Sequence, residues 1–542
     1  MRKLVGISII CFFVVAILFV LGKSLFFYQG RYQAPSAKLP SLEGVAVSSP
    51  TIGLFPEVPK RQAGTILVDS SHGNNFSPWE INVLLSGVVS QGFTVEYLKT
   101  VTQQEQTQDL REKLRSVDAF VIISPRSPVS KQEVDLIKQF VNKGGKLLLV
   151  EDPARKPQAY GYTRTEAIRI NDISAGFGLI FENDYLYNLK ENDGNYRYVS
   201  FRDFSQGELT SGLNRITLYC AGSISGGTGV VFTDDNTFAS NVETKGKLSP
   251  IALAADSKVL GIYNLTFMIQ PFNGSFDNDK LVSNICSWLT TSERTFTLSD
   301  FPHFLKDAPL VTYADVSLLR TGTELNNLLV GLGKNPHVAS YEEAASLSRD
   351  TVFIALFKDA AKMKKFLERG NLTCTDINIE VQGIGTVPQA GTSIIYLYKG
   401  GDARLLVILA DTGKRLQETC NLLKNGEFRQ WLVSDILTIY QPADFSLSPN
   451  PGTISFTSGG SATFIVSIIP SGQFADTVGL TSASIPAGLT VTPASATVTS
   501  PYVTTTFTVA STQPGTYTVT ITGTSGTLTH TTTVAVTVNA RS

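Results

Sequence analysis

The chain has few of the residues from which metal centres and disulfide frameworks are built. It contains four histidines and five cysteines in 542 residues. The cysteines are scattered, without Cys-x-x-Cys spacing, at Cys11, Cys220, Cys286, Cys374 and Cys420. This pattern predicts neither a cysteine-built zinc site nor a dense disulfide framework, although one or two bridges remain open in an oxidising compartment. No two histidines have the spacing of metal ligands, which argues against a histidine-built zinc centre.

Charged residues are also scarce, at 17% of the chain, and the net charge is −1. Proteins that bind nucleic acid usually carry a basic patch or a strongly basic balance. We therefore expect no nucleic-acid partner. The sequence also contains no motif that calls for a cofactor, and none is expected.

One long hydrophobic run stands at the N-terminus. Residues 4–22 carry no charge, and about 20 apolar residues suffice to cross a bilayer. Arg2 and Lys3 precede the run, which places the start of the chain on the cytoplasmic side. We predict an uncleaved transmembrane signal anchor over residues 1–28, with the bulk of the chain outside the cytoplasm. A cleaved signal peptide is the alternative, but its apolar core is normally shorter, at roughly 7 to 15 residues.

The rest of the chain is too long for a single core and predicts several domains. Residues 29–62 are rich in Pro, Ser, Ala and Gly and are expected to form a linker. The expected domains are an α/β domain over 63–295, a second α/β domain over 296–441, and an all-β sandwich over 442–542.

In the first α/β domain, short apolar strands alternate with single helices. The strands are predicted at 65–69, 93–98, 119–123 and 146–150, with later ones near 216–220 and 259–263. Because the strands are apolar on both faces, they predict a parallel sheet covered on both sides, in a doubly wound arrangement.

The second α/β domain and the sandwich follow from two further patterns. Strands are expected near 351–356, 377–381, 392–397 and 404–409, with helices near 323–332, 360–368 and 414–423. From about Ala443 only Asp444, Asp476 and Arg541 are charged, and period-two apolar stretches recur between Gly, Pro and Ser turns. This last pattern predicts a seven-stranded antiparallel sandwich.

Two stretches of the chain resemble known families. The segments VDSSHGNNFSPWEINVLLSGVVSQGFTVEYL, KQFVNKGGKLLLVEDP and FNGSFDNDKLVSNICSWL resemble DUF4350-type, glutamine-amidotransferase-like domains over about residues 64–292. The resemblance implies a flavodoxin-like sheet. The C-terminal hundred residues are similar to bacterial and archaeal surface-exposed Ig-like repeats, which implies an adhesive, spacing or stalk role.

The amidotransferase-like resemblance also implies where a catalytic group would stand. Catalytically active class I amidotransferases carry a nucleophilic cysteine at a strand-to-helix elbow, with a His and a Glu later in the sequence. The corresponding strand here is KLLLV, and Glu151-Asp152-Pro153 follow it in place of a cysteine. No His-x-Glu follows within the domain, so no catalytic residue is assigned.

Polar residues follow two strands of the predicted sheet and form the candidate ligand site. Asp69 ends the first strand, with His72 and Asn75 in the loop after it, and Glu151 and Asp152 end the fourth. If the two strands are neighbours, three carboxylates and one imidazole converge at one edge and suit a divalent cation or a polar ligand. The competing interpretation is that these residues cap helices and shape loops. The identity of any metal is open.

The sequence therefore predicts a membrane-anchored, extracytoplasmic protein that binds a ligand or an envelope or surface protein without catalysis. Two alternatives remain. One is a metal-dependent hydrolase that uses the strand-end Asp, His and Glu residues. The other is an accessory subunit of an ABC-type transport system, by analogy with the family alone.

Overall fold

The computed structural model describes residues 2–27, 64–99, 103–155, 168–241, 246–291, 294–306, 308–341, 349–400, 403–472, 474–483, 485–499 and 504–541. The chain falls into two units, Met1–Pro56 and Glu57–Ser542, and each is described by itself. The predicted linker over 29–62 lies outside the described residues.

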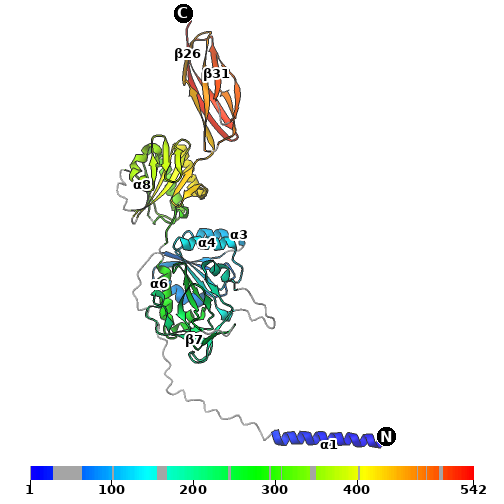
Figure 1. Cartoon of the computed structure of the whole chain (residues 1–542). Coiled ribbons are helices and arrows are strands. Elements are labelled where there is room, and N and C mark those ends of the chain that lie inside the picture. Colours follow the sequence, from blue (N-terminus) through cyan, green and yellow to red (C-terminus); the bar gives the residue numbers. More distant parts are fainter. Residues whose placement is uncertain are drawn as a thin grey trace. The chain divides into compact units, whose positions relative to one another are not determined.

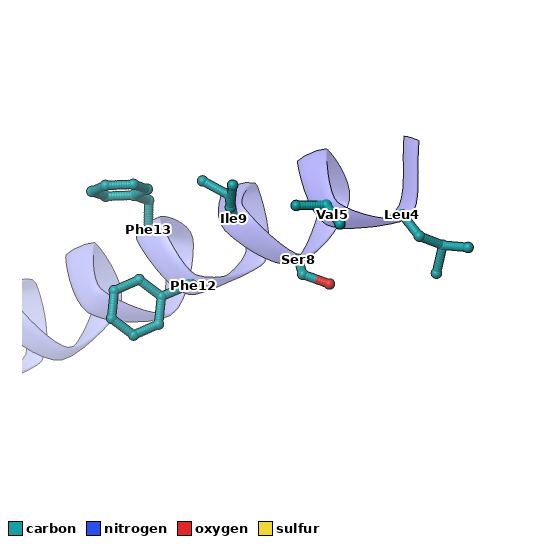
Figure 2. Close-up of a pocket in the computed structure, with 6 residues that line it drawn as sticks. All are labelled: Leu4, Val5, Ser8, Ile9, Phe12 and Phe13. Atoms are coloured by element: carbon teal, nitrogen blue, oxygen red, sulfur yellow. The ribbon is translucent and has the colours of Figure 1, made fainter. Parts of the chain in front are cut away.

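The first unit contains a long apolar helix, α1 (Arg2–Phe27). Its segment Lys3–Phe26 has 24 residues, and the most apolar 18 of them have a mean hydropathy of 3.2 and are not buried. At 1.5 Å per residue such a helix is about 36 Å long, enough for a hydrocarbon core of roughly 30 Å. Figure 2 shows apolar side chains, among them Ile9, Phe12 and Phe13, along part of α1. Exposed apolar residues also occur at consecutive positions from Phe12 to Val15, so the apolar surface is not a single narrow stripe. The predicted N-terminal apolar helix is confirmed.

The second unit begins with an eight-stranded sheet in its described residues. In spatial order the strands are β2 (Phe93–Leu98), β1 (Gly64–Asp69), β3 (Ala119–Ile123), β4 (Lys146–Val150), β14 (Val259–Ile262), β13 (Ile251–Ala254), β11 (Thr228–Phe232) and β8 (Asp203–Phe204). The strands from β2 to β14 are parallel, and the last three are antiparallel. The parallel arrangement predicted for β1 to β4 and β14 is confirmed, and three antiparallel strands that the sequence analysis did not predict extend the sheet. The turn between β13 and β14 is too short for the crossover that parallel strands need.

Successive residues of β1 enter two separate hydrophobic cores. Ile66 and Val68 pack into the core on one face of the sheet, and Leu67 packs into the core on the other. All three side chains are fully buried. This two-sided burial explains why the strand is apolar at consecutive positions and does not alternate.

Helices cover both faces of this sheet. α2 (Asn82–Ser90) and α6 (Asn278–Thr290) contact each other and supply side chains to the core that contains Ile66. α3 (Gln103–Lys113) and α4 (Lys131–Asn142) lie side by side, and α4 packs against the opposite core (Figure 1). Alternating strands and helices thus build a three-layer arrangement.

Short paired strands and one short helix, α5 (Asn171–Ser174), accompany the large sheet. The pairs are β5 (Ile180–Phe181) with β10 (Ile224–Ser225), β6 (Leu186–Asn188) with β12 (Thr237–Ala239), and β7 (Tyr198–Phe201) with β9 (Ile216–Tyr219). The strand predicted near 216–220 is β9, which pairs outside the large sheet.

The next part of the second unit contains a seven-stranded sheet among its described residues. Its order is β16 (His337–Ser340), β15 (Leu310–Tyr313), β17 (Thr351–Leu356), β22 (Ala403–Ala410), β21 (Ser393–Gly400), β24 (Leu437–Tyr440) and β23 (Leu432–Ser434). The first four strands are parallel, and the others are antiparallel. The helices are α7 (Leu319–Gly331), α8 (Lys364–Arg369) and α9 (Gly413–Asn425).

A separate three-stranded sheet stands beside it, in the order β18 (Leu372–Cys374), β19 (Asn378–Val381) and β20 (Gly385–Pro388). The strand predicted near 377–381 is β19 and belongs to this small sheet. Three other predicted strands, near 351–356, 392–397 and 404–409, are β17, β21 and β22 of the seven-stranded sheet.

The described residues of the C-terminal part form nine strands in two sheets. One sheet has the order β25 (Asp444–Asn450), β27 (Ser461–Ser471), β31 (Thr504–Ser511) and β29 (Leu489–Thr492). The other has the order β26 (Thr453–Thr457), β33 (Leu528–Asn539), β32 (Gly515–Ser525), β28 (Thr477–Ala483) and β30 (Ser495–Thr499). Side chains from both sheets share one core, which makes a β-sandwich.

The seven-stranded, fully antiparallel sandwich predicted from the sequence is wrong in two respects. There are nine described strands, and β26 pairs with β33 in parallel. The run that contains β25 and β26 is interrupted at Pro451-Gly452, and its two halves join different sheets. Proline lacks an N–H that could donate to the ladder, which favours a break between the two strands at this point.

Candidate functional site

The candidate site lies at the carboxyl ends of the parallel strands of the eight-stranded sheet. Asp69 is the last residue of β1, and Glu151 and Asp152 follow β4. β3 lies between these two strands, so they are not neighbours. The convergence predicted from the sequence required neighbouring strands, and the intervening β3 divides the candidate residues into two groups.

The first group is organised around the carboxylate of Asp69. Its Oδ1 accepts hydrogen bonds from the backbone N–H and the hydroxyl of Ser71, at 3.1 and 2.7 Å. Its Oδ2 accepts from His72 Nδ1 at 2.9 Å and from Asn74 Nδ2 at 3.0 Å. Asp69 and His72 are both buried. The Asp69 carboxylate is thus held by four hydrogen bonds from its own loop.

The second ring nitrogen of His72 faces two helices of the layer beside it. Nε2 lies 2.6 Å from the side-chain amide of Gln106 in α3 and 3.6 Å from Glu133 Oε1 in α4. Glu133 has no exposed surface, and its other oxygen accepts from the backbone and hydroxyl of Ser130 in a capping box. Asp69, His72, Gln106 and Glu133 form one network, here called the His72 network.

The charged groups of the His72 network stabilise one another in their ionised forms. Burial lowers the pKa of His72, but the hydrogen bond to Asp69 and the negative charges of Asp69 and Glu133 outweigh it and raise the pKa to about 9. Burial raises the pKa of Asp69 and Glu133, yet the nearby imidazolium charge and hydrogen bonds from neighbouring hydroxyls bring the pKa of both below its ordinary value. His72 therefore carries a positive charge at neutral pH between two carboxylates.

The second group uses its carboxylates to hold a neighbouring loop. Asp152 Oδ2 accepts from the backbone N–H groups of Leu265 and Thr266 at 3.0 and 3.2 Å, and from the Thr266 hydroxyl at 3.1 Å. Its Oδ1 accepts from the backbone N–H of Ala154 at 2.9 Å. Burial dominates and raises the pKa of Asp152, although these hydrogen bonds oppose the rise. Asp152 thus joins the end of β4 to the segment after β14.

Glu151 and Asn75 complete the second group. Glu151 Oε1 accepts from the backbone N–H of Asp152 at 3.0 Å, and burial raises the pKa of Glu151. Asn75 Nδ2 donates to the backbone carbonyl of Arg155 at 3.2 Å. Arg155 also forms an ion pair of 2.5 Å with Glu80. Asn75 therefore lies with the second group, although it follows the same strand as Asp69.

This arrangement does not assemble the cation site that the sequence suggested. In the part of the chain that the structure describes, no group of three or more His, Cys, Asp or Glu side chains is placed to hold a metal ion. His72 is buried and faces partners on both ring nitrogens, and the oxygens of Asp152 accept from backbone N–H groups. The geometry favours the interpretation in which these residues cap helices and shape loops.

Sequence reasoning missed three residues of this region. Gln106 and Glu133 reach His72 from helices that are distant in sequence. The one sequence signal for either residue is the Ser-x-x-Glu pattern that begins at Ser130, which predicts a capping box that includes Glu133. Ser124 directly follows β3 with a φ of 39°, and its buried side chain lies beside Glu151. Its only sequence signal is the Ser-Pro pair after an apolar strand.

Asp152→Ala is expected to reduce the free energy of unfolding of this domain by about 2–3 kcal/mol, because buried N–H groups lose their acceptor. Asp152→Asn keeps one acceptor oxygen and is expected to lose about half as much. Urea unfolding of the full chain measures the change, with hydrogen exchange of the β4 and β14 amides assigning it to this sheet. Equal losses in the two variants would contradict the assigned role.

Comparisons with known proteins give only distant likenesses. No protein-family model matches the chain, and no curated protein matches it in sequence. The mmIFT52 N-terminal domain is 16% identical, over 43% of this chain and 100% of that one, with a TM-score of 0.33. A conjugative transposon lipoprotein from Bacteroides eggerthii is 7% identical, over 17% of this chain and 95% of its own, with a TM-score of 0.14.

A third solved structure is the CARDB domain of the PF1109 protein from Pyrococcus furiosus, determined in complex with di-metal ions. It is 16% identical, over 18% of this chain and 96% of that one, with a TM-score of 0.13. These three scores are too low to carry an argument about fold or function.

Proposed function

We propose that this chain is a membrane-anchored protein whose folded parts lie outside the cytoplasm and bind a ligand or a protein partner at the cell envelope. The observation that carries the proposal is α1, a 24-residue apolar segment that no described part of the chain covers. Arg2 and Lys3 at its start support an orientation with the N-terminus in the cytoplasm.

The eight-stranded sheet is proposed to be a non-catalytic, amidotransferase-like domain with a flavodoxin-like core. The order β2-β1-β3-β4-β14 supports this proposal, because flavodoxin-like sheets have the order 2-1-3-4-5. The absence of a cysteine after β4 and the structural hydrogen bonds of Asp69 and Asp152 support a role without catalysis. No observation favours the metal-dependent hydrolase or the transport-accessory alternative.

The C-terminal sandwich is proposed to be an Ig-like module that contacts other envelope components. Its surface carries little charge, because its strands are built from Ser and Thr alternating with apolar residues. Such a module extends or attaches a surface protein without supplying chemistry of its own.

A topology experiment tests the proposal. Alkaline phosphatase fused to the C-terminus of the full chain in a bacterial host is expected to be active, and green fluorescent protein in its place is expected to be dark. The chain is expected to remain in the membrane pellet after alkaline carbonate extraction. Deletion of residues 2–27 is the control and is expected to abolish both the phosphatase activity and the membrane retention.

The size of the mature protein separates an anchor from a cleaved signal. Intact mass of the purified chain is expected to include the residues of α1. A fluorescent C-terminal fusion, or a mature chain that begins after α1 and is recovered in the soluble fraction, would refute the anchored model.

A further inference from the structure

A cleft opens at the carboxyl ends of two neighbouring strands of the seven-stranded sheet. β17 and β22 are parallel, and their last residues, Leu356 and Ala410, stand side by side. Leu356 and the residues that follow the two strands, Phe357 and Asp411, line the cleft, which has a volume of about 820 Å³. Ligands of open α/β sheets bind at this edge, and pockets for small molecules span roughly 300–1,000 Å³. The position and size of the cleft suit a small ligand.

The floor of the cleft is apolar. Phe357, Leu367 and Leu372 line it and are themselves buried in the core of this part of the chain. Ile377 also lines the cleft, yet 72% of its surface is exposed. A large apolar side chain left open beside a buried apolar floor is available to pack against a bound molecule.

Charges of both signs stand around this floor. Lys358 lies just beyond β17, Lys364 begins α8, and both are exposed. Glu368, one turn along α8, also lines the cleft and lies 3.8 Å from Lys364. Asp376 stands between β18 and β19, and Asp411 stands after β22. The backbone N–H of Gly391 donates to Asp411 Oδ2 at 2.6 Å, which holds this carboxylate in place at the cleft. Ammonium and carboxylate groups thus come from different elements, an arrangement that complements a ligand with both charges.

A strand edge also borders the cleft. β18 lies at one end of the three-stranded sheet formed by the described residues, and Thr373, Cys374 and Thr375 line the cleft. Edge strands present main-chain groups to extended peptides, and side-chain pockets beside the edge add selectivity.

We propose that this cleft binds a short peptide with free ends, which lies extended along β18. Its carboxylate faces Lys358 and Lys364, its ammonium group faces Asp376 and Asp411, and an apolar side chain covers Ile377 and the floor. This site is independent of the His72 network, and it gives the second α/β part of the chain a ligand-binding role.

Saturation-transfer NMR on the detergent-solubilised full chain tests the proposal. The probe is a pool of unblocked tripeptides, compared with the same pool acetylated at the N-terminus and amidated at the C-terminus. Saturation transfer is expected to the unblocked pool and to be strongly reduced for the blocked pool, because the blocked peptides carry no terminal charges.

Substitution of two adjacent lysines, Lys364 and Lys365, provides a matched control. Lys364→Gln and Asp376→Asn are expected to weaken binding about three- to tenfold, in line with the modest strength of exposed charge pairs. Lys365→Gln changes the next residue of α8, which does not line the cleft, and is expected to leave binding unchanged. No transfer to the unblocked pool, equal transfer to both pools, or equal effects of Lys364→Gln and Lys365→Gln would each overturn the proposal.

Discussion

His72→Ala is expected to lower the free energy of unfolding of the eight-stranded sheet domain by about 3–5 kcal/mol. The substitution removes the positive charge between Asp69 and Glu133, whose side chains are both fully buried. Each carboxylate would then remain in the protein interior without its charged partner. Removing one member of a buried ion pair is costly for this reason, even where replacing the whole pair is neutral.

His530→Ala provides the control for this prediction. His530 also forms an ion pair with an aspartate, through Nε2 and Asp444 Oδ1 at 2.8 Å, but 28% of its side chain is exposed. Solvent screens such a pair, so the loss is expected to stay within about 1 kcal/mol. Urea unfolding of the full chain measures both variants, with hydrogen exchange of the β1 and β4 amides as the signal for His72→Ala and of the β25 and β33 amides as the signal for His530→Ala. A loss for His72→Ala as small as that for His530→Ala would show that the network does not hold the loop after β1.

The stability of the same domain is expected to fall as the pH rises from 6.5 towards about 9. The pKa of His72 is about 9 in the folded chain against 6.5 for an ordinary histidine. Because the folded pKa is the higher one, its contribution is complete below pH 6.5 and disappears as the pH rises through the folded value. The loss is on the order of 3 kcal/mol, since one pKa unit corresponds to about 1.4 kcal/mol.

On the acidic side of the pH profile, the stability of the domain is expected to fall as the pH falls. The pKa values of Asp69 and Glu133 are lowered in the folded chain, so their contribution is present above their unfolded values and is lost as the pH falls. Unfolding curves from pH 4 to 9.5 on the unmodified chain and on His72→Ala would measure both limbs. The variant is expected to lose the alkaline decline, and the same decline in both proteins would assign it to groups other than His72.

A sequence prediction was confirmed where its signal lies within one short segment of the chain. The N-terminal apolar helix and the strands β1, β3, β4, β17 and β22 were predicted because a continuous apolar run can be recognised from the sequence alone. The antiparallel strands β11 and β13 were missed, as was the parallel pairing of β26 with β33. These pairings join segments that no local pattern connects.

The candidate site also combines features that the local sequence predicts with features that depend on distant segments. Asp69, His72, Asn75, Glu151 and Asp152 were selected because polar residues follow apolar strands, and the structure does place them at the carboxyl edge of the sheet. Their convergence depended on where β3 lies in the sheet. The residues near Asp69 and Asp152 give no information about that position. The partners Gln106 and Glu133 come from helices that reach the loop only after the three layers have packed.

By itself, the sequence determined the apolar N-terminal helix, the alternation of strands and helices, and the change to a Ser- and Thr-rich β region, because hydrophobic periodicity and composition are local properties. Only the tertiary structure decided the strand order, the separation of the carboxylates into two groups and the cleft beside β17 and β22. Those features arise when segments far apart in the chain bury their apolar faces together, and the lowest free energy of that packing selects which polar groups meet.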